Sequence, residues 1–185
     1  MTNGTQFEIR ELTRNDGPAV LEFARALPSH DLLFMARDLT QPKVVDAWLR
    51  SVEEGRITSY AAIAGGRMVG YTALISDDLS WSPHVGEIRV IVADNWRGKG
   101  VGRRLVEPTF RKAIEKGLEK LTARMTTDQH GAINMFEDMG FRAEAMLRDQ
   151  VRARDGKTYD LAILSLNVAA SASGLAALGI TEALS

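Results

Sequence analysis

Apolar residues recur with two different periods along this chain, and the two patterns alternate. Stretches with period two, or with continuous β-branched residues, predict strands, whereas apolar residues spaced three or four apart predict helices. The predicted strands cover residues 7–12, 57–64, 68–75, 85–92, 118–125, 141–153 and 157–168, and the predicted helices cover 17–27, 41–54, 101–116 and 132–139. The resulting order, β-α-α-β-β-β-α-β-α-β-β, predicts an α/β (α+β) fold.

Helix caps and glycine turns set the boundaries between these elements. Asp16 and Thr40 are expected to cap the first two helices, because their side-chain oxygens can accept hydrogen bonds from first-turn N–H groups. Gly65 and Gly66 predict a tight hairpin turn, since glycine tolerates the positive φ that such turns require. Residues 1–168 are expected to form one domain, and residues 169–185, almost entirely Ala, Ser, Gly and Leu, a frayed tail.

Composition narrows the function classes. The 185 residues carry a formal net charge of −1, which gives no reason to expect nucleic-acid binding or a polybasic membrane anchor. The chain contains no cysteine, so a cysteinyl intermediate is excluded, and its three histidines lack metal-ligand spacing, so no metal site is expected. A polar N-terminus without a signal peptide, and the lack of an apolar run of about 20 residues, indicate a cytoplasmic protein.

The segment after the strand 85–92 carries the most specific chemical signal. Three glycines alternate along a turn, basic residues surround them, and a helix with an apolar stripe begins at Val101. The glycines are Gly98, Gly100 and Gly102, and the basic residues are Arg97, Lys99, Arg103 and Arg104. The first turn of a helix has unpaired N–H groups and the positive end of the helix dipole, and missing side chains let an anion reach them. The pattern predicts a diphosphate site.

Two other glycine motifs do not fit this segment. A Walker A loop requires Gly-Lys-Ser or Gly-Lys-Thr after its spacer, but Val101 follows Gly100. A Rossmann fingerprint follows the first strand and requires a third glycine where Leu105 stands. A glycine turn that merely precedes a basic helix stays open as a structural alternative.

The turn, read as Arg97-x-x-Gly100-x-Gly102, resembles the R/Q-x-x-G-x-G/A pattern of the GCN5-related N-acetyltransferase (GNAT) family. Downstream, residues 132–141 (Ala-Ile-Asn-Met-Phe-Glu-Asp-Met-Gly-Phe) resemble the family's A-x-x-L-Y-E-K-x-G-F helix. The element order from Phe7 to Val168 matches as well. The resemblance implies a mixed central sheet with helices on both faces. It also implies an acyl-CoA-dependent N-acyltransferase with acetyl-CoA as the default donor.

The resemblance also implies where acetyl-CoA binds. Its pyrophosphate would rest on the N–H groups of the turn, and its pantetheine arm would pair like an extra strand with the backbone near Ile91 and Val92. The amine would attack the thioester directly in a ternary complex, which agrees with the absence of cysteine. N–H groups at the strand end would polarise the thioester carbonyl. The turn residues implied in cofactor binding are Arg97, Gly98, Lys99, Gly100, Val101, Gly102 and Arg103.

An attacking ammonium must first lose a proton, so a general base or a water chain is required. Glu87 is the candidate, because it lies among apolar residues on the strand 85–92, where related enzymes often place a glutamate. An apolar setting would raise the pKa of a carboxyl group. The alternative is an ion pair with Arg89 on the same strand face. Strand alternation places Glu87 and Ile91 on one face unless a bulge intervenes.

The chain departs from the family pattern at positions near the predicted cofactor. The family tyrosine that reprotonates the leaving thiolate corresponds to Phe136, which cannot donate a proton. The coenzyme-contacting asparagine seven residues earlier corresponds to Gln129. Asn134 could share that role, or it is simply an exposed polar residue.

The sequence says less about the amine that accepts the acetyl group. In the segment 28–38, Leu33, Phe34 and Met35 either line an acceptor pocket or, as favoured, pack on the core. The final hairpin is basic through Arg148, Arg152, Arg154 and Lys157, which would attract an acidic acceptor or is simply solvated. Neither observation distinguishes a small amine from a protein amine. The apolar tail could pack across a homodimer interface, so monomer and homodimer both stay open.

Two other functions stay open beside the N-acetyltransferase. One is a non-catalytic acyl-CoA-binding or regulatory module. Phe136 favours this alternative slightly, whereas Glu87 and the intact turn disfavour it. The other is a nucleotide phosphotransferase, against which the failed Walker pattern argues.

Overall fold

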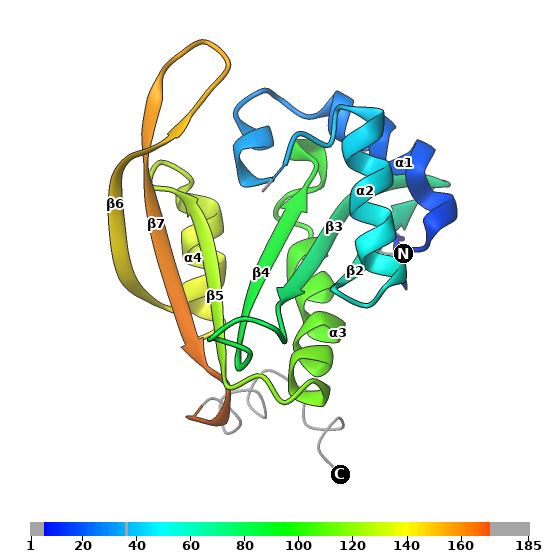
Figure 1. Cartoon of the computed structure of the whole chain (residues 1–185). Coiled ribbons are helices and arrows are strands. Elements are labelled where there is room, and N and C mark those ends of the chain that lie inside the picture. The colour runs from blue at the N-terminus through cyan, green and yellow to red at the C-terminus, as the bar shows by residue number, and fades with distance from the viewer. Residues whose placement is uncertain (1–5, 36, 171–185) are drawn as a thin grey trace, which may run out of the picture. The chain divides into compact units, whose positions relative to one another are not determined.

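The computed structural model describes residues 6–35 and 37–170 (Figure 1). The chain divides into two compact units. The first unit reaches up to Ile75 and continues over Arg89–Thr109. The second consists of Ser76–Ile88 and the chain from Phe110 onward. The predicted tail after residue 170 lies outside the described residues.

The strands of the described chain form one seven-stranded sheet in the order β1-β2-β3-β4-β5-β7-β6. Their bounds are Glu8–Glu11 (β1), Ile57–Ala64 (β2), Arg67–Ser76 (β3), Val85–Val92 (β4), Lys120–Thr126 (β5), Arg142–Arg152 (β6) and Thr158–Asn167 (β7). The pairs β1–β2, β2–β3, β5–β7 and β6–β7 are antiparallel, whereas β4–β5 is parallel. The sheet is therefore mixed, and the predicted fold class is confirmed.

The helices are α1 (Gly17–Ala26), α2 (Pro42–Glu53), α3 (Val101–Glu115) and α4 (His130–Asp138), with short 3-10 helices η1 (Arg14–Asp16), η2 (Asp31–Phe34) and η3 (Asp94–Trp96). All four α-helices were predicted from the apolar spacing, with boundaries shifted by one or two residues. Within the described residues, no helix is both long and apolar enough to cross a membrane.

Aromatic residues dominate the core of the first unit. Phe23 of α1 meets the ring of Tyr71 edge-on at 6.0 Å, and Trp48 of α2 lies 5.3 Å from the same ring. Burying such side chains contributes on the order of 2–3 kcal/mol each. Burial also raises the pKa of the Tyr71 hydroxyl. The apolar faces of both helices are buried because their apolar residues recur at helical spacing.

Of the two predicted helix caps, Asp16 has the predicted position and Thr40 does not. Asp16 stands directly before α1 but makes no capping hydrogen bond. Its carboxylate instead accepts hydrogen bonds from the Thr13 N–H at 2.7 Å and from Arg10 at 2.6 Å. The predicted cap at Thr40 is wrong by one residue, because Pro42 takes the first helical position of α2 and leaves Gln41 as the N-cap. The Thr40 hydroxyl donates to Asp38.

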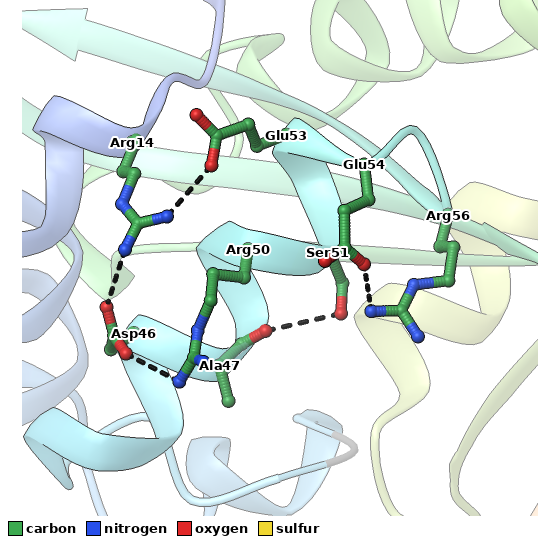
Figure 2. A network of polar contacts seen from close by, with 8 residues as sticks. All are labelled: Arg14, Asp46, Ala47, Arg50, Ser51, Glu53, Glu54 and Arg56. Carbon is green, nitrogen blue, oxygen red and sulfur yellow. Dashed lines mark hydrogen bonds and ion pairs between the residues drawn. The ribbon is translucent and has the colours of Figure 1, made fainter.

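A polar network covers the exposed surface of α2 (Figure 2). Arg14 lies 2.8 Å from Glu53 and 3.5 Å from Asp46, and Arg50 pairs with Asp46 one helical turn away at 2.8 Å. Glu54 and Arg56 form a further ion pair just beyond the helix. About half of each of these side chains is exposed to solvent.

In the second unit, β5, β7 and β6 form an antiparallel group. The strand β5 begins two residues later than predicted, because the Leu118 N–H still donates to Ala113 at the end of α3. The hairpin of β6 and β7 is irregular between Leu147 and Val151, where Asp149 has a positive φ of 49°. This irregularity is a bulge that sequence patterning did not predict.

Candidate cofactor and catalytic site

The glycine-rich turn owes its course to two left-handed residues. Gly98 and Gly100 have φ values of 69° and 77°, which residues with a Cβ rarely adopt. An added Cβ at either position would meet no atom within 4 Å, so the protein itself does not need the space around them. Gly102 differs, because it is buried in the first turn of α3.

A row of backbone N–H groups follows these glycines. In the part of the chain that the structure describes, none of the N–H groups of residues 98–103 donates to another backbone group. Arg104 is the first to do so, to the Gly100 carbonyl at 3.1 Å. The turn therefore presents consecutive donors at the positive end of the α3 dipole, as predicted for an anion site.

The basic residues around the turn do not all behave alike. The Lys99 ammonium lies 5.0 Å from the Trp96 ring, and Arg103 is exposed. Arg97 is differently engaged: its guanidinium pairs with Asp31 at 2.6 Å and with Asp94 at 3.1 Å. Its Nε also donates to the carbonyl of Val92. Much of the charge of Arg97 is thus already neutralised by protein carboxylates.

The end of β4 lies unusually close to β3. A Cβ on Gly70 would lie 2.8 Å from the Ile91 carbonyl oxygen and 3.4 Å from the Val92 Cα. The Ala93 N–H donates to the Val69 carbonyl at 2.9 Å. Gly70 is therefore needed for this close approach of the two strands, which the sequence analysis did not predict. A glycine inside a strand pattern is the sequence feature that indicates such an approach.

Two arginines hold the 3-10 helix η2 at both of its ends. Arg97 pairs with Asp31 at its start, and the Arg89 Nη1 donates to the carbonyl of Phe34 at its end, at 2.6 Å. Met35 belongs to the core, and Phe34 packs against it. The favoured core-packing interpretation of these two residues is therefore confirmed. Asp31 and the role of Arg89 were not predicted.

Glu87 lies on β4 opposite Thr122 in the parallel register with β5. Its carboxylate is 3.6 Å from the guanidinium of Arg124, and its side chain is 21% exposed. The sequence predicts an apolar setting for Glu87, but in the structure a charged side chain, Arg124, lies beside it. Arg124 was missed because partners across strands cannot be read from local spacing. The role of Glu87 as a base stays a prediction.

The helix α4 and the residue before it carry the remaining predicted positions. The Gln129 side-chain oxygen accepts from the Thr126 N–H at 3.0 Å, while its buried Nε2 has no hydrogen-bond partner among the described residues. Asn134 is exposed. Phe136 is buried and meets Phe141 edge-on at 5.0 Å, so it serves the core of the second unit.

The Acetyltransferase (GNAT) family model matches residues 22–141. The chain belongs to this family. It is 29% identical over 128 residues to the L-methionine sulfoximine/L-methionine sulfone acetyltransferase of Pseudomonas aeruginosa, covering 66% of this chain and 72% of that protein. It is 36% identical over 78 residues to a Bacillus subtilis protein named provisionally as a phosphinothricin acetyltransferase, covering 42% and 47%.

Solved GNAT structures share the fold of this chain. A Salmonella typhimurium protein described with its cofactor acetyl-CoA is 20% identical and has a TM-score of 0.72, covering 88% of this chain and 94% of that one. The predicted family and reaction class, an N-acetyltransferase, are confirmed, and the catalytic role is favoured over a non-catalytic module. The phosphotransferase alternative is not supported by these relatives.

Proposed function

We propose that this GNAT acetyltransferase transfers the acetyl group of acetyl-CoA to the α-amino group of a small amino acid. The row of N–H groups at residues 98–103, which donate to no backbone group among the described residues, carries the proposal, because it provides a ready site for a pyrophosphate. Such chemistry would place the protein in the cytoplasm, where acetyl-CoA is available.

The residues of the turn fit the cofactor. Left-handed Gly98 and Gly100 leave open space beside the donors, which an anion can enter. The exposed Lys99 and Arg103 add positive charge that no described carboxylate neutralises in an ion pair. Arg97 contributes less charge to an anion, because two aspartates already pair with it. Backbone groups, rather than Arg97, are therefore the main ligands in this proposal.

Further residues would serve the rest of the acyl donor and the reaction. The backbone near Ile91 and Val92 would pair with the pantetheine arm, and the Gln129 Nε2 has hydrogen-bonding capacity left for it. Asn134 and Phe136 complete the proposed lining, Phe136 by apolar contact alone. The amine nitrogen forms a bond to the thioester carbon as the carbon–sulfur bond breaks. Before this attack Glu87 takes the first ammonium proton, directly or through water. The nitrogen releases its second proton to water as the amide forms, and water supplies a proton to the thiolate.

The acceptor assignment rests on the named relatives. Methionine sulfoximine, methionine sulfone and phosphinothricin are all α-amino acids with a polar oxidised group on the side chain. Their shared acetylatable group is the α-amine. A small amino acid of this type is therefore the first acceptor to test, ahead of a protein amine.

The chain offers a matched pair of glycines to test the cofactor site. Gly100 in the turn and Gly66 in the β2–β3 hairpin have φ values of 77° and 76°, and neither has an atom within 4 Å of an added Cβ. Valine should therefore strain both backbones equally. We expect Gly100→Val to weaken coenzyme A binding by more than about 100-fold, because it obstructs N–H donors worth about 1.5–3 kcal/mol each to a charged group.

Calorimetry with coenzyme A measures this difference, and thermal unfolding of both variants controls for the fold. Equal affinities of folded Gly100→Val and Gly66→Val would contradict the site. Thiol release from acetyl-CoA should then be followed with L-methionine sulfone, L-methionine sulfoximine, a peptide with a free N-terminus and a polyamine. Turnover with the peptide alone would overturn the acceptor assignment. Binding without turnover on any amine would favour the non-catalytic module.

A further inference from the structure

Arg97 connects two segments that are far apart in the sequence. It directly precedes the row of N–H groups at residues 98–103 that donate to no described backbone group. Its guanidinium nevertheless points to Asp31, which lies 66 residues earlier in the chain. The same side chain also bonds the Val92 carbonyl at the end of β4. The Arg97 side chain therefore links the turn to the end of β4 and to η2.

The Asp31 carboxylate depends on this contact. Its side chain is 9% exposed, and a buried carboxylate without a partner is costly, because little water remains to solvate it. Asp94, by contrast, is 78% exposed and can exchange Arg97 for water at little cost. Of the two carboxylates, Asp31 is the one whose position requires Arg97.

The segment η2 is held by apolar packing of Leu32 and Phe34 on the core and by two arginine contacts at its ends. Its backbone makes single-turn hydrogen bonds at Asp31, Leu33 and Met35, and its far end is held by Arg89. Isolated 3-10 turns of this length are weak, so their order depends on such tertiary contacts. Both arginines come from β4 or from the segment that follows it. Whatever fixes the end of β4 and the turn therefore also fixes η2.

We propose that Arg97 is a positioning residue that couples occupancy of the 98–103 turn to the order of η2. Coenzyme A bound at the turn fixes the backbone of Arg97 and its guanidinium, and the ion pair with Asp31 transmits this order to Asp31–Phe34. By linkage, an ordered η2 strengthens coenzyme binding by the same factor. This inference rests on the proposed function, because it requires the coenzyme at the turn.

Hydrogen exchange with and without coenzyme A tests the coupling and does not require the amine to be known. In the wild type, we expect coenzyme A to slow exchange of the η2 amides at least about fivefold, the low end of coupling between sites. In Asp31→Asn this protection should disappear, while the amides of residues 98–103 stay protected. Asp94→Asn is the matched control and should retain both effects. Arg97→Lys should retain part of the η2 protection seen in the wild type, because an ammonium can still pair with Asp31.

A kinetic arm uses L-methionine sulfone as the amine. Asp31→Asn should raise the KM for acetyl-CoA at least about fivefold while kcat changes less than about twofold, since the coupling weakens coenzyme binding and the reacting groups are intact. If coenzyme A protects residues 98–103 of the wild type but leaves η2 exchange unchanged, the coupling is wrong and the proposed function stands. If coenzyme A does not bind the wild type at all, both the coupling and the proposed function are wrong. Loss of η2 protection in Asp94→Asn as well as Asp31→Asn would also contradict the coupling through Asp31.

Discussion

The ion pairs of the first unit fall into two groups that differ in the exposure of their carboxylates. On α2, Asp46 and Glu53 are 54% and 58% exposed and pair with Arg14 across the surface (Figure 2). At the other extreme, Asp16 and Asp31 are each 9% exposed and lie 2.6 Å from an arginine. The buried pairs are also the ones that hold 3-10 helices, η1 and η2.

This difference decides what each pair can do. Exposed pairs typically contribute about 0–1 kcal/mol, because water and salt screen them and their long side chains lose entropy. A buried carboxylate that loses its partner is left as an uncompensated charge, so its geometry is held much more firmly. We therefore expect buried pairs to fix the conformation of short segments, and exposed pairs to leave it unchanged.

The largest expected effect concerns Glu87, whose exposure lies between the two groups. Its pair with Arg124 is long, at 3.6 Å, so it should fix little structure and leave the carboxylate available for chemistry. We expect Glu87→Gln to lower the turnover number by roughly 10²–10⁴-fold, the usual contribution of a general base, with acetyl-CoA affinity unchanged. The acidic limb of the pH–rate profile should flatten in the same variant if Glu87 is the base.

Arg124→Met provides the control for Glu87, since it removes the pair but keeps the carboxylate. It should change turnover far less than Glu87→Gln does. Full turnover of Glu87→Gln with its best amine would mean that water carries the proton. Equal losses of turnover in Glu87→Gln and Arg124→Met would show that Glu87 has a purely structural role. Its ion pair with Arg124 would then behave like the buried pairs of Asp16 and Asp31.

Asp16 gives the clearest pH dependence. The hydrogen bond from Arg10, helped by bonds from Thr13, lowers the pKa of Asp16 from 3.8 to about 2. A depressed pKa contributes stability that is fully present above the unfolded value of 3.8 and is lost as the pH falls towards 2. At neutral pH, Asp16→Asn should lower the free energy of unfolding by about 1–2 kcal/mol, a range reduced because Arg10 is partly exposed.

Chemical denaturation of Asp16→Asn and wild type at pH 7 and pH 2.5 measures this contribution. The difference between the two proteins should shrink at the lower pH. A difference that stays constant from pH 7 to pH 2.5 would show that the carboxylate charge is not what stabilises η1.

Local signals explain why most of the fold could be predicted. The strands β2 and β4 have the predicted bounds, because alternating or β-branched residues end there at glycine or polar turns. The left-handed turn at Gly98 and Gly100 follows from the same local chemistry. What could not be predicted is which side chains meet across the chain. Asp31 pairs with Arg97 and Glu87 with Arg124 only after distant segments have packed.

Asp16 is the N-cap residue of α1, as predicted, but its carboxylate does not make the expected capping hydrogen bond. A single aspartate before a helix is a sound capping signal, but a nearby arginine is a stronger hydrogen-bond partner than a helix N–H group. Arg10 lies on β1, only six residues before Asp16, so this competing partner is local in the sequence. The candidate site shows a similar limit: its backbone donors were predicted from the glycines, whereas the ionic partners of Arg97 were not.

The smallest effect is expected in the exposed network on α2. Arg14→Gln removes its pairs with Asp46 and Glu53 and keeps a long polar side chain (Figure 2). The free energy of unfolding should stay close to that of the wild type, because both carboxylates return to water at little cost. At about 1 M salt the difference from wild type should vanish, since the Debye length then falls to about 3 Å. Denaturation curves at low and high salt measure both values. A loss of stability as large as that of Asp16→Asn, and persisting at high salt, would show that an exposed network can fix conformation as firmly as a buried pair, and the contrast between the two groups would not hold.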